Sequence, residues 1–176
     1  MQKAGLLFAL VLFFSVAAAA QEVPKVEVFG GYSHLLANLN NTSYNLDGVH
    51  ASAAENVNSW FGGVLDFSSN FGSNAGLNVN AQSIMYGPRF TYRKSRAVTP
   101  SVHALFGAIR GSRGFDGISE SKYRFTMGLG GDIDLRINDR MAFRLVQVDY
   151  MPTHFLNLRQ DNIRVSVGFV FRFPRW

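Results

Sequence analysis

Residues 162–173, close to the C-terminus, read NIRVSVGFVFRF and carry the clearest pattern in the chain. Alternate positions form one uninterrupted apolar series, Ile163, Val165, Val167, Phe169, Phe171 and Phe173. The positions between them hold arginine, serine, glycine and valine. Because successive side chains of a β-strand point to opposite faces, a period of two predicts a strand. One face of this strand is apolar up to its aromatic end, as expected where a strand faces lipid.

Seven further stretches have the length and alternation of strands. They are residues 25–34, 45–55, 60–70, 81–93, 99–110, 121–137 and 140–151. A tilted strand of about 9–11 residues crosses a membrane, and each stretch is near or above that length. No apolar run after residue 20 is long enough for a transmembrane helix. The chain is therefore predicted to be all-β, an eight-stranded antiparallel up-and-down transmembrane β-barrel.

The connections between these stretches alternate in length. Residues 56–59, 94–98 and 138–139 form short links, whereas residues 35–44, 71–80, 111–120 and 154–161 form longer polar links. Transmembrane barrels have short periplasmic turns and longer outer loops. An even number of strands also returns the C-terminus to the side of the N-terminus. The longer links are therefore predicted to be loops at the cell surface.

Two local features break the simple alternation. Pro88 lies inside a predicted strand and lacks an N–H group for the ladder, so a bulge or a missing hydrogen bond is expected there. Arg144, Gln147 and Asp149 cannot all point to one face of a regular strand. Either a bulge shifts the register, or Arg144 does not point into the barrel.

The N-terminal segment has the pattern of a secretory signal peptide. Lys3 precedes an apolar run over residues 4–16, and small residues follow at positions 17–20. We expect cleavage after Ala20 and a single barrel domain over residues 21–176. The alternative, an N-terminal membrane helix, would need about 20 apolar residues, more than the run contains.

Charge and cysteine content exclude several classes of function. The formal net charge is +5, but lysine and arginine are spread along the chain without a cluster, so no nucleic-acid partner is expected. The chain contains no cysteine, which excludes disulfides, thiol chemistry and thiolate metal sites. We predict no cofactor and no metal site.

Alternation alone does not say which face of a barrel meets solvent, since a soluble lipocalin-like barrel is apolar inside. Aromatic residues at the strand ends favour the membrane version. The other face, with both charge signs and many small residues, suits a narrow lumen. The C-terminal strand also resembles the sorting signal of bacterial outer-membrane proteins, carried here by Ser166, Gly168, Phe171 and Phe173. The resemblance departs at the end of the chain, because residues 174–176 follow Phe173 at the point where the pattern usually stops on an aromatic residue.

The order of motifs along the chain resembles the small eight-stranded outer-membrane barrels of the OmpA/OmpX type, in the group of the outer membrane protein beta-barrel domain. The motifs are VEVFGGYS (26–33), YGPRFTYR (86–93), HALFGA (103–108), GLGGDIDLRI (128–137), VQVDY (146–150) and VSVGFVFRF (165–173). The resemblance implies a bacterial outer-membrane location and a monomer surrounded by outer-membrane lipid and lipopolysaccharide. It also implies that the barrel-assembly machinery and periplasmic chaperones are partners during biogenesis.

Charged residues on the polar faces are predicted to form a network inside the lumen. They are Glu27, Asp66, Arg89, Arg93, Arg124, Asp132, Asp134, Arg136, Arg164 and Arg172. Such residues could line a pore, but unpaired charges in a narrow lumen are costly, which favours mutual pairing. Asp132 and Asp134 could also suggest metal binding or acid–base catalysis. Arg124 and Arg136 share their strand face and are the expected partners.

The predicted function is a non-enzymatic integral barrel with a filled polar lumen and a structural or surface-interaction role through its outer loops. One alternative is an outer-membrane lipid A-modifying hydrolase with His50 as base and Ser52 as nucleophile, although the sequence identifies no carboxylate to orient His50. Another alternative is a small barrel that transports an apolar ligand. No catalytic residue is predicted.

Overall fold

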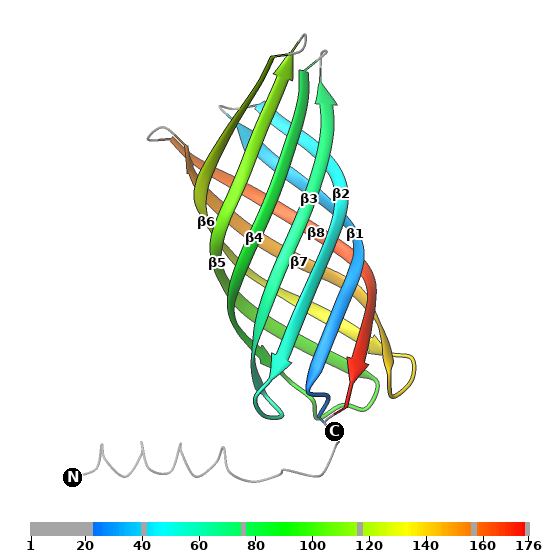
Figure 1. Cartoon of the computed structure of the whole chain (residues 1–176). Coiled ribbons are helices and arrows are strands. Elements are labelled where there is room, and N and C mark those ends of the chain that lie inside the picture. The colour runs from blue at the N-terminus through cyan, green and yellow to red at the C-terminus, as the bar shows by residue number, and fades with distance from the viewer. Residues whose placement is uncertain (1–22, 40–41, 75–76, 116–117, 156–157, 175–176) are drawn as a thin grey trace, which may run out of the picture.

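A computed structural model describes residues 23–39, 42–74, 77–115, 118–155 and 158–174. Eight antiparallel strands form a closed barrel in which each strand pairs with its sequence neighbours and the last pairs with the first (Figure 1). The strands are β1 (Val26–Leu39), β2 (Thr42–Asn56), β3 (Phe61–Asn74), β4 (Leu77–Thr91), β5 (Val98–Phe115), β6 (Ile118–Arg136), β7 (Met141–Phe155) and β8 (Leu158–Phe173). This confirms the predicted fold class.

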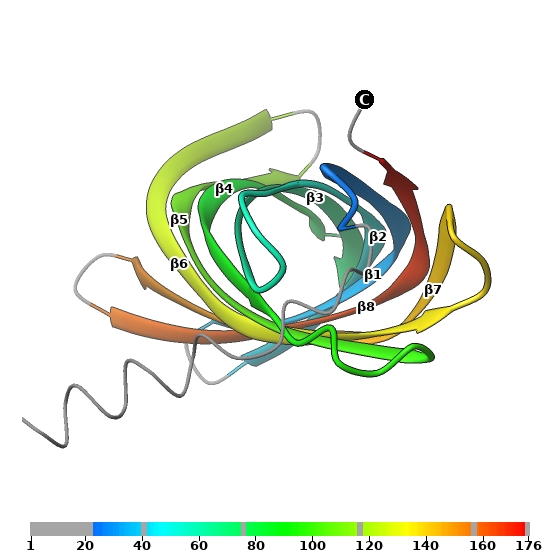
Figure 2. The ribbon, with the colours of Figure 1, turned by 90° about the horizontal axis from the view of Figure 1, so that it is seen from below.

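The predicted signal peptide over residues 1–20 lies outside the described residues and stays a prediction. Within the described part of the chain, no helix is long and apolar enough to cross a membrane. The seam between β1 and β8 continues to the end of the sheet, where the Lys25 N–H donates to the Phe173 carbonyl at 2.8 Å. Viewed from below, the strands enclose a single ring (Figure 2).

Large apolar side chains cover the outside of the barrel, and polar side chains fill much of the inside. Exposed outward residues include Phe67, Ile84, Tyr86, Val102, Phe106, Phe125, Leu129 and Phe169. On the alternate positions, residues such as Glu27, Asp66 and Asp132 are almost completely buried. The polar face therefore points inward, as predicted for the membrane version of the barrel and opposite to the soluble version.

Aromatic and hydrogen-bonded polar residues mark the two limits of this apolar surface. At the end with the short turns and both described chain ends, Trp60 stacks on Phe90 with ring centroids 6.0 Å apart. Towards the other end, Tyr32 donates a hydrogen bond to Asp47, and Tyr150 donates one to Asp161. We call these two ends of the barrel the terminal end and the hairpin end.

The four long polar links are not loops, which corrects the prediction from sequence. β1 continues to Leu39 and β2 already starts at Thr42, and the other three connections at the hairpin end have the same form. Asparagine, serine and glycine in these links indicated loops because they favour turns. In the barrel, the first and second halves of each link pair with each other as antiparallel strands. This pairing satisfies the hydrogen-bonding groups of the backbone. The hairpins therefore extend as paired strands towards their tips (Figure 1).

The two irregularities expected from sequence are both present. In β7, Arg144 pairs with Asp134 and Val146 pairs with Ile133, so Leu145 is an extra residue and the register shifts. This bulge places Arg144, Gln147 and Asp149 on the buried face together. In β4, pairing with β5 is interrupted at Gly87 and Pro88 while the register on both sides is unchanged. Pro88 therefore causes a gap in the ladder and not a bulge.

Candidate functional site in the barrel lumen

Three arginines converge on one carboxylate near the terminal end of the lumen. Glu27 on β1 accepts hydrogen bonds from Arg89 at 3.0 Å, from Arg93 at 2.9 Å and from Arg172 at 3.1 Å. These cations come from β4, from the residues that follow it, and from β8. Glu27 is buried, so its charge is compensated by protein groups instead of water.

A second cluster occupies the middle of the lumen. Asp132 accepts a hydrogen bond from Arg89 at 2.9 Å, and Asp134 accepts two from Arg144 at 2.8 and 3.2 Å. Arg144 also lies over the ring of Phe29, 4.5 Å from its centroid. Arg89 thus connects this cluster to Glu27.

A third cluster continues the network towards the hairpin end. Arg164 donates to both Asp66 and Asp149, with shortest distances of 2.8 and 2.7 Å. Asp149 also accepts a hydrogen bond from Gln147, and His103 is hydrogen-bonded to it at 2.6 Å. Through Gln147, which bonds Arg144, the charged side chains form one connected network.

His50 belongs to this network and has the neighbours of a serine-hydrolase histidine. Its Nε2 lies 2.6 Å from Asp66 Oδ2, and its Nδ1 lies 3.0 Å from Ser166 Oγ. The structure thus supplies the carboxylate missing from the sequence argument, but the serine is Ser166 and not Ser52. A serine, a histidine and an aspartate in this order could activate a nucleophile.

Access to substrate argues against that chemistry. His50, Asp66 and Ser166 are each about 1% exposed, and Asp66 is already held by Arg164. The cavity in the lumen that Asp66 and Ser52 line has a volume of about 10 Å³, about the space of one water molecule. An acyl chain does not fit there. The contacts of His50 are those of a buried, hydrogen-bonded structural residue.

Apolar side chains fill the lumen beyond the charged network. This cluster contains Leu35, Ala37, Leu46, Ala54, Val64, Val79, Ala81, Met85, Leu105 and Met151. Leu35 and Ala37 of β1, Leu46 of β2, Val79 and Ala81 of β4 and Met151 of β7 lie on the part of each strand that leads into the hairpins, whereas Ala54 faces Glu27 across the β1–β2 ladder. Most of the apolar cluster therefore lies beyond the charged network towards the hairpins, and a few of its residues pack among the charged side chains.

The predicted lumen residues are brought together by the fold, except for Arg124 and Arg136. Arg136 lies at the terminal end and is paired with Asp139 of the same turn. Arg124 lies nearer the hairpin tips, where it donates to the Tyr123 carbonyl at 3.0 Å. Their expected pairing with Asp132 and Asp134 was wrong, because residues on one strand face are spread along the barrel axis. Cations from β4 and β7 reach those carboxylates across the lumen or from the adjacent strand.

Sequence reasoning missed several members of the network. Alternation does not predict the direction of His103, because neither alternating set of β5 is purely apolar. Arg144, Gln147 and Asp149 cannot all point to one face of a regular strand, and this conflict in the sequence indicates the bulge. Among the described residues, no group of three or more histidine and acidic side chains could hold a metal ion.

The residues of the predicted sorting signal divide between the two faces of β8. Ser166 points into the lumen towards His50, whereas Phe171 and Phe173 are exposed on the outside. Gly168 faces Gly31 across the seam, and a Cβ at Gly168 would lie 2.5 Å from the Gly31 Cα. Close approach of β1 and β8 thus requires glycine at this position. The role of these residues in sorting stays a prediction.

The closed ring, apolar exterior and ion-paired interior define an outer-membrane β-barrel of eight strands. The family model of the outer membrane protein beta-barrel domain matches residues 6–171, and the chain belongs to this family. Its location is the bacterial outer membrane. A comparison with curated proteins gives no match.

Several solved structures share the fold at low sequence identity. Neisserial surface protein A (NspA) has a TM-score of 0.75 at 15% identity, over 85% of this chain and 97% of that chain. Ail, the attachment invasion locus protein of Yersinia pestis, in complex with the heparin analogue sucrose octasulfate, has a TM-score of 0.62 at 17% identity, over 85% and 99%. The N-terminal β-barrel domain of Pseudomonas aeruginosa OprF has a TM-score of 0.55 at 9% identity, over 84% and 98%.

Proposed function

We propose that this protein is a non-enzymatic outer-membrane barrel whose extended hairpins contact other surfaces. The proposal rests on strand pairing that continues towards the hairpin tips, beyond the polar residues that end the apolar outer surface of the barrel. Asp47 and Asp161 lie on the outward faces of β2 and β8, and the strands continue past both towards the hairpin tips. Paired backbone holds a projecting hairpin in one conformation, which lowers the entropy cost of binding a partner.

The hairpin of β5 and β6 is the strongest candidate for the contact. These are the longest strands, with 18 and 19 residues. Residues 110–124 include the basic residues Arg110, Arg113, Lys122 and Arg124, and the acidic residues Asp116 and Glu120. Backbone pairing sets Arg113 opposite Glu120 and Gly111 opposite Lys122. The basic excess favours a partner with negative charge.

The structural relatives are consistent with this role. NspA is a surface protein by its description, and Ail was solved with a sulfated heparin analogue. We therefore propose an anionic polysaccharide as the class of partner, reached from the cell surface. The outward apolar face is proposed to contact outer-membrane lipid, with lipopolysaccharide around the hairpin end.

The lumen network is proposed to stabilise the barrel and to leave no passage for solutes. Arg89, Arg144 and Arg164 each have carboxylate partners, and the apolar cluster follows them along the axis. Charges that bind one another are not arranged to conduct an ion, because each binding step would break a buried pair.

A binding experiment tests the proposed surface role. Cells that express the protein should bind immobilised heparin more strongly than cells without it. The triple variant Arg110→Gln, Arg113→Gln, Lys122→Gln should lose most of that binding at low salt. A matched variant of the β3–β4 hairpin, Ser73→Gln with Asn78→Gln, should retain it. Heat-modifiable migration on a denaturing gel shows that each variant is folded. Equal binding by all variants would reject the β5–β6 hairpin, and no binding by the wild type would reject the polysaccharide.

A further inference from the structure

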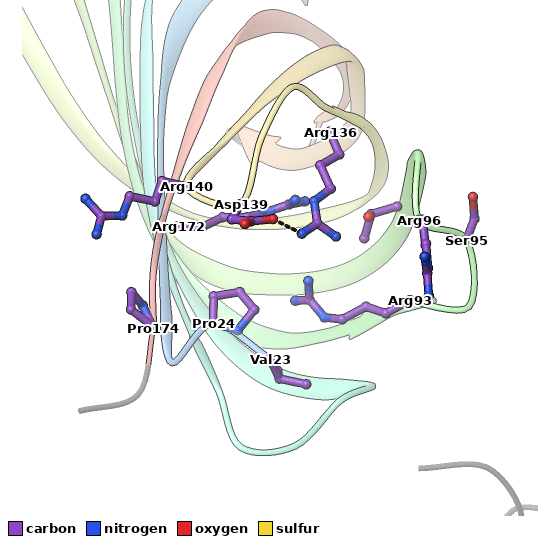
Figure 3. A pocket seen from close by; sticks show the side chains of 11 residues that line it. Val23, Pro24, Arg93, Ser95, Arg96, Arg136, Asp139, Arg140, Arg172 and Pro174 are labelled. Atoms are coloured by element: carbon purple, nitrogen blue, oxygen red, sulfur yellow. Dashed lines mark hydrogen bonds and ion pairs between the residues drawn. The ribbon is translucent and has the colours of Figure 1, made fainter. Parts of the chain in front are cut away.

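The terminal end of the barrel opens into a hollow lined by arginines. Its volume is about 650 Å³, within the range of about 300–1,000 Å³ typical of small-molecule sites. The lining side chains come from the chain before β1, the β4–β5 and β6–β7 turns, and the end of β8 (Figure 3). We call this hollow the basic vestibule. The charged lining residues are Arg93, Arg96, Arg136, Asp139, Arg140 and Arg172.

The balance of charge in the vestibule is strongly positive. Five arginines line it with a single carboxylate, Asp139, which is paired with Arg136. Arg93 and Arg172 both donate to Glu27, which lies deeper in the lumen than the vestibule. Arg96 and Arg140 have no carboxylate partner among the described residues. A concave site with this excess of cations concentrates anions.

The fold holds the arginine-bearing segments together by backbone hydrogen bonds. The Arg136 N–H donates to the Ala97 carbonyl at 2.8 Å, which ties the end of β6 to the β4–β5 turn. The Arg172 N–H donates to the Arg140 carbonyl at 2.8 Å, which ties β8 to the β6–β7 turn. Arg136 is thus fixed relative to the β4–β5 turn, and Arg172 relative to Arg140, before any ligand arrives. A preorganised site loses less entropy on binding.

Two buried arginine nitrogens at this site have unused hydrogen-bonding capacity. Arg172 is 7% exposed, and its Nη2 has no hydrogen-bond partner among the described residues. Arg93 Nε is likewise buried without a partner in the part of the chain that the structure describes. Buried N–H groups normally have partners, so a ligand that draws these side chains towards the hollow would satisfy both. The exposed side chains of Arg96 and Arg140, which line the hollow, are available to a ligand without such a movement.

We propose that the basic vestibule binds a phosphate-bearing anion. The planar guanidinium group donates paired N–H groups that match the spacing of phosphate oxygens. Several arginines around one hollow suit a group that carries more than one negative charge and several acceptor oxygens. The shared chemistry covers an anionic phospholipid headgroup at the edge of the barrel and a soluble phosphorylated compound. The site lies at the opposite end from the hairpins and does not depend on the proposed surface role.

The test uses the folded protein in nanodiscs of pure phosphatidylcholine at low salt. Isothermal titration with inorganic pyrophosphate should give saturable binding. The double variant Arg96→Gln, Arg140→Gln should bind at least about tenfold more weakly, which corresponds to about 1.4 kcal/mol. These two residues are exposed and lie outside the Glu27 cluster, so the barrel should fold unchanged. Lys94→Gln, in the same β4–β5 turn but outside the lining of the hollow, is the control and should bind as the wild type does.

A second arm distinguishes the two sources of phosphate. The titration is repeated in nanodiscs in which phosphatidylglycerol replaces part of the phosphatidylcholine. Weaker pyrophosphate binding by the wild type there supports a lipid headgroup as occupant, and unchanged binding supports a soluble compound. No binding by the wild type in pure phosphatidylcholine, or equal affinity of the wild type and the double variant, would overturn the proposal.

Discussion

Arg164 on β8 donates hydrogen bonds from Nη1 and Nη2 to both carboxylate oxygens of Asp66 on β3, at 2.8 and 3.1 Å. β3 and β8 are not neighbours in the barrel, so this bidentate pair spans the lumen. Both side chains are about 1% exposed or less. Water does not reach either charge, so both are compensated by protein groups, which also include His50 beside Asp66 and Asp149 beside Arg164.

The two residues of this pair should stabilise the barrel cooperatively. Arg164→Met should lower the free energy of unfolding by about 3–5 kcal/mol, because it leaves the buried Asp66 and Asp149 without their shared cation. Asp66→Asn should cost less, because Arg164 keeps Asp149 as a partner. The double variant should lose less than the sum of the two. Urea unfolding in lipid vesicles, followed by tryptophan fluorescence, measures all three.

The control for this cycle is the exposed pair of Arg136 and Asp139. Arg136→Gln should cost about 1 kcal/mol or less, because surface ion pairs contribute little. Strictly additive effects of Asp66→Asn and Arg164→Met would show that the two residues do not stabilise each other.

The lipid-facing surface gives a second prediction. Leu129 is exposed on the outside of β6 between the two limits of the apolar surface. Leu129→Arg should destabilise the inserted barrel by about 2–4 kcal/mol, the cost of arginine at the bilayer midplane. Tyr123→Arg, on the same face but nearer the hairpin end, should cost much less. Equal costs in vesicle unfolding assays would mean that the apolar band is misplaced.

The third prediction concerns the serine, histidine and aspartate in the lumen. His50→Ala, Ser52→Ala and Ser166→Ala should all leave lipid A unchanged, because the wild type itself should not remove an acyl chain. The buried site has no space for an acyl chain. Mass spectrometry of lipid A from cells with and without the protein provides the measurement. Loss of one acyl chain that requires His50 and either serine would establish a hydrolase.

Topology provides a fourth prediction. An epitope inserted between residues 116 and 117, at the tip of the β5–β6 hairpin, should be labelled by antibody on intact cells. An epitope after Asn138, in the turn between β6 and β7, should be labelled only after the outer membrane is permeabilised. The reverse pattern would place the basic vestibule at the cell surface. Gly114 would be a poor insertion site, because it lies within β5.

The last prediction tests the sorting signal against ordinary lipid contact. Phe169 and Phe173 are both outward on β8, and 46% and 48% exposed. If the barrel-assembly machinery recognises the C-terminal pattern, Phe173→Ala should lower the outer-membrane yield more than Phe169→Ala does. Val170 is unsuitable as a control because it is fully buried beside Phe29 and Ala142. Equal yields from the two phenylalanine variants would contradict the sorting role.

Much of the fold was predictable because the alternation of apolar and polar residues within one strand reflects the two environments that its faces meet. The alternation in residues 162–173 and 121–137 identified the strands and separated an apolar from a polar face, and aromatic residues at the strand ends indicated that the polar face lines the lumen. Strand ends were less predictable, since Asn, Ser and Gly in residues 71–80 favour turns whether or not a partner strand continues beside them. Their pairing depends on the neighbouring strand and not on their own composition.

The sequence by itself divided the residues of each regular strand between two faces, since side-chain direction follows from position within a strand, and the aromatic strand ends indicated which face points inward. The tertiary structure decided which inward residues meet. Asp66 and Arg164 are far apart in the chain, and their contact depends on closure of the ring and on strand tilt. The same holds for Arg144, whose direction depends on the bulge at Leu145, and for the basic vestibule, whose arginines come from separate turns. Periodicity is a property of one strand, whereas a contact across the lumen depends on the registers of all eight.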